Sequence, residues 1–442
     1  MGAIQAVKGT RDILPAEVGY WQQVEAVAAQ ILHRAAYQEM RPPVLEHTEL
    51  FERGIGEATD VVSKEMYTFD DRATPPRSLT LRPEVTAGLV RAFIQNSLHT
   101  SGGVQRIWCV GPVFRYENPQ AGRQRQFHQL DVEAIGSGDP RADVEVIAIA
   151  TDILNSLGLT KLHLDLNSVG NREDRQHYRE ALVNYFTPYQ NELDKDSQER
   201  LGRNPLRILD SKDKRTQEIA QGAPNILDYL SADSQRHFDR VQQLLNVLGI
   251  NYQLNPRLVR GLDYYTHTAF EIISDDLGAQ ATVCGGGRYD SLVQELGGPD
   301  TPAVGWGMGL ERLILLLQQK QIVSSRPDFY IVSRGEQAEA QALVLAQKLR
   351  TQFSVELDLS GSKFAKQFKR ADRSAASACL VLGEAEAASN TVQLKWMASG
   401  EQQELSQAQL LAMTEQLREQ LALHHREKEY EELGVSDSES RG

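Results

Sequence analysis

The sequence predicts an α+β fold, in which an antiparallel-sheet domain with a helical insertion precedes a small α/β domain. Short strand patterns separated by Gly and Pro dominate the first part of the chain. Polar helical patterns replace them at about 171–251, and strands alternate with helices after residue 326. We therefore expect a sheet domain at 1–325, an α/β domain at 326–423 and a charged, mobile tail at 424–442.

The sheet domain should begin with an amphipathic helix. Apolar residues recur at helical spacing between Val24 and Ala35, and the helix stops before Arg41-Pro42-Pro43. Short strands, with turn residues between them, are expected at 43–46, 78–81, 106–116, 130–136 and 161–169. Such closely spaced strands favour a largely antiparallel sheet.

The polar region should form the helical insertion, with helices at 174–185 and 234–248. A strand at 269–273 returns the chain to the sheet, and a strand at 303–309 leads into a helix with a buried apolar stripe. The glycines of that last strand, Gly305-x-Gly307-x-Gly309, lack the Gly-x-Gly-x-x-Gly spacing of a dinucleotide-binding loop. We therefore exclude a dinucleotide site there.

The α/β domain should contain strands at 329–332, 355–359 and 379–382, with helices between them at 337–351 and 363–373. This alternation predicts a mainly parallel sheet. The second helix is basic, with side chains spaced to share one face: Lys363, Lys366, Arg370 and Arg373, and Lys369 beside them. A solvated helix face is the simpler interpretation, and a local RNA contact is the alternative.

Composition limits the classes of function. The 442 residues carry a net charge of -13, which is the wrong sign for coating nucleic acid, so any RNA contact must be local. Cys109, Cys284 and Cys379 are far apart, which favours buried free thiols over a disulfide framework or a zinc site. No apolar run approaches the roughly 20 residues of a membrane span. We expect a soluble protein of the cytoplasm.

Three arginines lie in apolar surroundings: Arg115, Arg260 and Arg312. A buried guanidinium is costly unless a carboxylate or phosphate meets it, so each could face an anionic ligand. Structural ion pairs, with Glu117 or Glu311 as the carboxylate, are the alternative.

Two separated segments carry a family resemblance. Phe114-Arg115-Tyr116-Glu117, with its continuation to Gln129, resembles the second signature of class II aminoacyl-tRNA synthetases. Leu258-Val259-Arg260-Gly261-Leu262-Asp263-Tyr264-Tyr265-Thr266 resembles a segment peculiar to histidyl-tRNA synthetases. Pro43 and Gly309-Leu310-Glu311-Arg312 match the first and third class II signatures. The chain is thus similar to bacterial histidyl-tRNA synthetases over about residues 8–423.

The resemblance implies a class II catalytic domain, an anticodon-binding α/β domain and a homodimer with the first signature at its interface. It implies that the protein activates L-histidine with ATP to histidyl-adenylate, and then transfers histidine to the 3′ end of tRNA(His). Activation is attack by a carboxylate that already lacks its proton at neutral pH, so no general base is required. The reaction needs alignment and positive charge near the phosphates.

By the same resemblance, Arg115 contacts the α-phosphate of ATP, Arg312 contacts the γ-phosphate, and Arg123 also binds ATP. Arg260 is the extra arginine that in this family reaches the α-phosphate and the substrate carboxylate, which implies a catalytic role. Mg²⁺ is expected to bridge phosphate oxygens, although the sequence does not reveal its protein ligands. No tightly bound organic cofactor is expected.

The implied histidine site has a part for each group of the substrate. Glu84 and Thr86 match residues that hold the α-amino group, and Gln129 matches one near the carboxylate. Neutral imidazole offers one donor and one acceptor. The resemblance assigns these to Glu133 and Tyr265, and it places Tyr264 and the Tyr289 of Gly285-Gly286-Gly287-Arg288-Tyr289-Asp290 in the same pocket. Glu84 could otherwise pair with Arg82, and the glycines could form a hairpin turn.

For tRNA, the resemblance implies contacts at Gln120 and at the basic helix, through Lys363, Lys366, Lys369 and Arg370. Three positions depart from the usual family residues: Asn118, Gln124 and His267. Two other functions are considered. One is a regulatory paralogue that partners ATP phosphoribosyltransferase but lacks the anticodon domain and the intact Arg260 segment. The other is a non-catalytic RNA-binding or histidine-sensing protein.

Overall fold

The computed structural model describes residues 3–56, 59–280, 282–319 and 326–433. The chain forms two compact units, Met1–Ile322 and Val323–Gly442. The expected α+β fold, with an antiparallel-rich sheet and a C-terminal α/β part, is confirmed.

An eight-stranded sheet, counted over the described residues, forms the centre of the first unit, in the order β1-β5-β6-β11-β10-β9-β7-β8. The neighbours from β5 to β7 all pair antiparallel, and only the two edge pairs, β1 with β5 and β7 with β8, are parallel. Its strands are β1 (Gln38–Glu39), β5 (Gln105–Phe114), β6 (Gln126–Ile135), β7 (His163–Ser168), β8 (Gln253–Leu254), β9 (Thr266–Ile273), β10 (Thr282–Arg288) and β11 (Ala303–Gly309).

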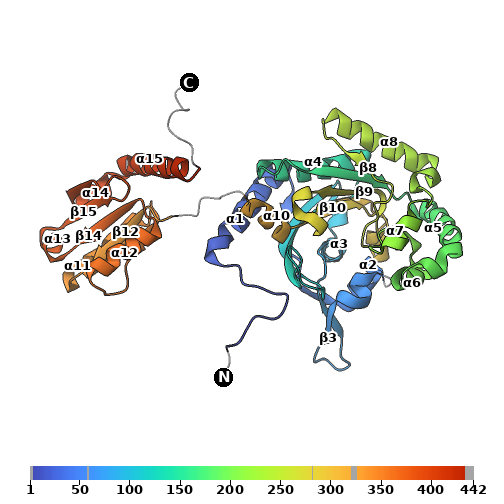
Figure 1. Ribbon diagram of the computed structural model, residues 1–442, viewed down its shortest axis with the longest axis horizontal. Helices are drawn as coiled ribbons and strands as arrows, with labels where there is room; N and C mark the ends of the chain where they lie inside the picture. The colour runs from blue at the N-terminus through green and yellow to red at the C-terminus, as the bar shows by residue number, and fades with distance from the viewer. Residues whose placement is uncertain (1–2, 57–58, 281, 320–325, 434–442) are drawn as a thin grey trace. The chain divides into compact units, whose positions relative to one another are not determined.

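Helices cover one face of this sheet and bury the main core against it (Figure 1). These helices are α1 (Pro15–Arg34), α4 (Pro140–Ser156), α8 (Ala232–Val247) and α10 (Leu310–Gln318). Strand alternation sends large apolar side chains such as Trp306 and Met308 of β11 into this core. The alternate residues of β11 are the glycines of the Gly-x-Gly-x-Gly pattern, and they belong to the opposite face.

The opposite face meets α3 (Thr86–Gln95) and a smaller apolar cluster that includes Tyr264 and Tyr289. A small sheet in the order β2-β4-β3 lies before α3 in the chain. The remaining elements of this region are β2 (Leu45–His47), α2 (Thr48–Ile55), β3 (Tyr67–Asp70), β4 (Ser78–Leu81) and α9 (Leu292–Glu295).

The helical insertion has a core of its own, around Tyr178, Leu182 and Phe186. It comprises α5 (Arg172–Phe186), α6 (Lys195–Arg203), α7 (Lys214–Ala220) and α8. A capping box between Asn171 and Asp174 starts α5 sharply, because each side chain satisfies a backbone N–H of the other. The insertion is therefore a packed substructure. It lies between β7 and β9 in the sequence and contributes α8 to the main core.

The second unit holds a five-stranded sheet, as counted in the described part of the chain, in the order β13-β12-β14-β15-β16. Its strands are β12 (Phe329–Ser333), β13 (Val355–Leu357), β14 (Ala378–Leu382), β15 (Thr391–Trp396) and β16 (Gln402–Ser406). Its helices are α11 (Glu336–Leu349), α12 (Phe364–Ser374), α13 (Glu384–Ser389), α14 (Gln407–Ala412) and α15 (Thr414–Leu433).

One expectation for this unit needs correction. The sheet is not mainly parallel, because β15 and β16 add two antiparallel pairings to the two parallel ones. The alternate burial of Val392, Leu394 and Trp396 shows a half-buried strand that the sequence analysis missed.

Helix α15 continues to Leu433 through residues of high helix propensity, and so includes the first part of the tail expected at 424–442, whose mobility stays a prediction. Residues 434–442 lie outside the described residues.

All three cysteines are buried free thiols, as expected. None of the helices in the described ranges is long and apolar enough to cross a membrane.

Candidate active site

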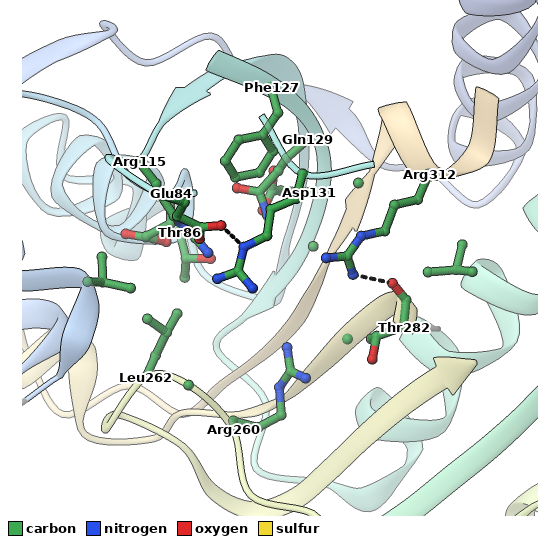
Figure 2. A pocket seen from close by; sticks show the side chains of 18 of the residues that line it. Glu84, Thr86, Arg115, Phe127, Gln129, Asp131, Arg260, Leu262, Thr282 and Arg312 are labelled. Atoms are coloured by element: carbon green, nitrogen blue, oxygen red, sulfur yellow. Dashed lines mark hydrogen bonds and ion pairs between the residues drawn. The ribbon is translucent and has the colours of Figure 1, made fainter. Parts of the chain in front are cut away.

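A pocket of about 270 Å³ opens on the sheet face that α3 flanks (Figure 2). It brings together residues from positions 61 to 312 of the chain. The predicted site residues that line it are Glu84, Thr86, Arg115, Arg123, Gln129, Arg260, Tyr264, Tyr265 and Arg312. The two separated segments that carry the family resemblance therefore meet in one place.

Glycines of β11 leave space for polar side chains at the floor of the pocket. In the register of β6 with β11, Gly305 lies opposite Glu133, Gly307 opposite Asp131 and Gly309 opposite Gln129. A Cβ atom on Gly307 would lie 2.9 Å from Gln129 Nε2 and 3.0 Å from Asp131 Oδ1, and one on Gly305 would overlap the Glu133 carboxylate. The side chains of Gln129, Asp131 and Glu133 on β6 thus occupy space beside β11. A residue larger than glycine at position 305 or 307 would fill that space.

Acidic side chains with little exposure to solvent lie at this floor. Glu84, Asp131 and Glu133 are all buried. Burial raises the pKa of each, and the negative charges of Glu133 and Glu84 raise that of Asp131 further. Glu84 Oε2, Asp131 Oδ2 and Gln129 Oε1 find no hydrogen-bond partner among the described residues. The two buried carboxyl oxygens without donors, on Glu84 and Asp131, are well suited to an ammonium group.

Glu133 lies just beneath the pocket floor. Thr86 Oγ1 donates to Glu133 Oε1 at 2.7 Å, and the Tyr289 hydroxyl donates to Glu133 Oε2. Burial raises the pKa of Glu133 to about 8, although these two hydrogen bonds oppose the shift. Tyr289 is itself buried, and its ring packs edge-on against Tyr264 at a centroid distance of 5.5 Å.

The other side of the pocket is cationic. Arg115 follows β5, and its Nε donates to Pro83 O at 2.7 Å. Arg123 pairs with Glu117, a carboxylate that the sequence analysis considered as a partner for the other three arginines. Arg312 on α10 donates to Thr282 O (Figure 2). Burial lowers the pKa of Arg312, and the positive charges of Arg123 and Arg115 lower it further. Clustered guanidinium groups that repel each other favour a polyanionic ligand.

Arg260 reaches the pocket from the irregular segment before β9 (Figure 2). It pairs with Glu271 on β9, whose other oxygen accepts from Thr282 Oγ1 at 2.9 Å. Its guanidinium lies against Gly285, where a Cβ atom would contact Nη2 at 2.5 Å. The glycine run of β10 therefore gives room to an arginine, and it is a strand rather than a hairpin turn.

Some predicted residues lie elsewhere. Glu133 and Tyr289 are buried beneath the described lining instead of on it. Gln120 is exposed in the β5–β6 connection, where its backbone forms an isolated antiparallel β-bridge with that of Arg123. The basic helix α12 belongs to the second unit, with Lys363, Lys366 and Lys369 exposed. Arg370 differs from these lysines, because it pairs with Asp358 at 2.8 Å.

Sequence reasoning missed Asp131 and Glu271. Asp131 could have been found, because strand alternation puts Gln129, Asp131 and Glu133 on one face of β6. Glu271 meets Arg260 only through the fold, and no local pattern marks it. Among the described residues, no group of three or more His, Cys, Asp or Glu side chains is placed to hold a metal ion.

Comparison with known proteins decides the family. Residues 9–313 match the family described as histidyl-tRNA synthetase, and residues 328–417 match the anticodon binding domain. A histidine–tRNA ligase from Rippkaea orientalis is 70% identical over 96% of this chain and 99% of its own length. One from Gloeothece citriformis is 70% identical over 97% of this chain and all of its own.

The chain belongs to the histidyl-tRNA synthetase family. The apo crystal structure of S. aureus histidyl-tRNA synthetase is similar, with a TM-score of 0.78 and 36% identity over 93% of this chain and all of that one. The family expected from the sequence, and the ligase activity that defines it, are thereby confirmed. The anticodon domain and the intact Arg260 segment are the features that separate this synthetase from the regulatory paralogue considered above.

The raised pKa of Glu133 predicts a cost in stability that depends on pH. The folded protein holds a proton on Glu133 up to about pH 8, whereas the unfolded chain releases it near 4.5. Folding stability therefore falls as pH rises between these values. We expect Glu133→Gln to raise the free energy of unfolding by about 1–3 kcal/mol at pH 8 and by less at pH 5, measured by thermal or urea unfolding without ligand. An increment equal at both pH values would contradict this electrostatic account.

Proposed function

We propose that this pocket activates histidine with ATP, the acidic floor binding the amino acid and the arginines binding the phosphates. The observation that carries the proposal is the separation of charge within one pocket. Buried carboxylates with raised pKa values lie on one side, and mutually repelling guanidinium groups lie on the other. An ammonium group at one end of a ligand pair would favour ionisation of these carboxyl groups, and a polyphosphate at the other end would offset the charge of the guanidinium groups.

Histidine would be held at three points. Glu84, Thr86 and the neighbouring Asp131 would accept hydrogen bonds from the ammonium group, with Gln129 near the carboxylate. The imidazole would meet Glu133 at one nitrogen and Tyr265 at the other, with Tyr264 beside it. Glu133 already accepts from Thr86 and Tyr289 and holds a proton below about pH 8, so it can offer the ring nitrogen one O–H donor, or a further acceptor site once it is ionised. An apolar side chain of similar size would leave these groups unpaired, which is costly when they are buried.

The arginines would align the reacting groups. Arg115 and Arg260 would contact the α-phosphate, so that the histidine carboxylate and the pyrophosphate leaving group lie in line. Arg312 and Arg123 would contact the terminal phosphates. The negative charge that accumulates on the phosphate oxygens in the transition state would then lie among fixed positive charges, which need no reorganisation. The carboxylate is already ionised, so no residue needs to remove a proton in this step.

Mg²⁺ is proposed to enter with ATP. The ion prefers oxygen ligands and keeps much of its water, so phosphate oxygens can hold it without a protein cage. The absence of a metal-ligand cluster among the described residues is compatible with that mode of binding. When bound, Mg²⁺ would offset the charge of the phosphates beside Arg312.

The second step would transfer histidine to the 3′ end of tRNA(His). Gln120 is exposed on the β5–β6 connection beside the pocket, where an acceptor end could approach. The exposed lysines of α12 are the proposed tRNA contacts of the second unit. Arg370 contributes less to that proposal, since Asp358, Ser360 and Ser362 already engage its guanidinium group.

We further propose that the enzyme is a homodimer of the cytoplasm. The first signature at Pro43 supports the dimer by family likeness. Three buried free thiols suit a reducing compartment.

Arg260 is predicted to be essential for activation. Arg260→Ala should reduce histidine-dependent ATP–pyrophosphate exchange by about 10²-fold or more, since removing one donor to developing charge has an effect of that order. Arg257→Ala is the matched control, because Arg257 is exposed in the same stretch and donates to Gln221 O. Exchange with histidine alone among the amino acids, lost in the first variant and retained in the second, supports the assignment. Equal rates in the two variants would refute it.

The basic helix is predicted to act on tRNA only. Lys366→Glu should raise the KM for tRNA several-fold and leave ATP–pyrophosphate exchange unchanged, because it replaces attraction to phosphate with repulsion. Lys348→Glu, an equally exposed lysine on α11, serves as the control for net charge. If both variants aminoacylate tRNA with the same kinetics as the unmodified enzyme, α12 does not contact tRNA.

A further inference from the structure

The segment that carries Arg260 lacks regular structure of its own. Residues 258–265, all of them described, run between β8 and β9 without forming a helix or a strand. Four side chains of this segment line the pocket: Arg260, Leu262, Tyr264 and Tyr265. Backbone carbonyls outside helices and sheets need other donors when they are buried. The position of the arginine therefore depends on what holds these carbonyls.

Side chains of the helical insertion supply most of those donors. Arg175 Nη1 donates to Asp263 O at 3.0 Å and to Tyr265 O at 2.7 Å. Arg207 Nη1 donates to Arg260 O at 3.3 Å. Asn204 Nδ2 donates to the Asp263 carboxylate at 2.7 Å. The insertion thus donates hydrogen bonds to three residues of the segment, Arg260, Asp263 and Tyr265.

The side chains that donate these hydrogen bonds are themselves held in place by the start of α5 and by Asp60. Arg175 lies in the first turn of α5, directly after the capping box that fixes the start of that helix. Arg207 lies near Asp60 at 3.6 Å, and Arg200 pairs with the same carboxylate at 2.9 Å. Asp60 lies outside both the insertion and the segment, so the insertion also has an anchor in the sheet domain apart from the segment.

The contact surface is nearly filled. A cavity of only about 30 Å³ lies between the insertion and the segment, lined by Arg175, Asn204, Arg207, Arg260 and Asp263 among others. This volume holds a few water molecules at most. A shift of the insertion would therefore displace the segment, and a shift of the segment would displace the insertion.

We propose that Arg175 is a positioning residue for histidine activation, through which the helical insertion holds Arg260 and Tyr265 in their catalytic arrangement. Arg175 is outside the set of described residues that line the pocket, so it acts through the segment rather than on the substrate. One guanidinium nitrogen fixes the carbonyls on either side of Tyr264. A displacement of about 1 Å in a catalytic group can reduce a rate by about 10²-fold. This inference rests on the proposed roles of Arg260 and Tyr265.

The test compares two arginines of the same helix. Arg175→Met keeps the apolar stem and removes the donors. Arg179→Met is the matched control, because Arg179 lies one turn later and donates to Gly202 O within the insertion. In histidine-dependent ATP–pyrophosphate exchange with the full chain, we expect Arg175→Met to lower kcat by about 10-fold or more and to raise the KM for histidine. The KM for ATP should change little, Arg179→Met should resemble the unmodified enzyme, and Arg175→Lys should recover part of the loss.

A double-variant measurement separates positioning from general weakening. If Arg175 acts through Arg260, adding Arg175→Met to an Arg260→Ala enzyme should lower the residual rate far less than it does alone. Equal losses in both backgrounds would overturn the inference, and so would identical kinetics for Arg175→Met and Arg179→Met. Should Arg175→Met fail to fold, Arg207→Met, which removes the donor to Arg260 O, takes its place with the same criteria. No exchange in the unmodified enzyme would instead refute the proposed function.

Discussion

The active site depends on a strip of sheet backbone that carries no side chains. On β11, Gly307 and Gly309 line the pocket and Gly305 lies on the same face of the sheet, whereas Trp306 and Met308 fill the core on the other face. Buried charged groups need space as well as partners, and a close-packed sheet face offers little. Because glycine occupies the facing positions, Gln129, Asp131 and Glu133 can lie across the next strand. Gly285 of β10 makes the same allowance for Arg260.

Clearing this face has an energetic consequence. Three carboxylates are brought together out of water, and their raised pKa values show that the folded protein is less stable for it. The cationic side of the pocket is likewise crowded, since Arg115 and Arg123 disfavour the charge on Arg312. Substrates of opposite charge would relieve both groups. Under the proposed function, the fold would hold the groups for binding and alignment in place before any ligand arrives.

Local sequence patterns account for much of this architecture and only part of its assembly. Strand and helix periodicity place β6, β9, β11 and α10, and signature likeness selects Arg115, Arg260 and Arg312. Alternation along β6 marks Asp131 as well, but the family likeness names only Gln129 and Glu133 on either side of it. Arg175 could not be predicted, since it lies 88 residues from the Asp263 carbonyl it holds. Contacts of this kind arise from how the insertion packs, which no short pattern encodes.

Histidine affinity in a series of glycine variants tests the account most directly. A Cβ atom on Gly309 would meet only Arg312 Cδ at 3.9 Å, one on Gly307 would press on Gln129 and Asp131, and one on Gly305 would occupy the place of the Glu133 carboxylate. Calorimetric titration of histidine into the three folded alanine variants should show near-normal affinity for Gly309→Ala, a clear loss for Gly307→Ala and the greatest loss for Gly305→Ala. Equal affinity in all three would contradict the claim that Gly305 and Gly307 leave the space that the histidine site needs.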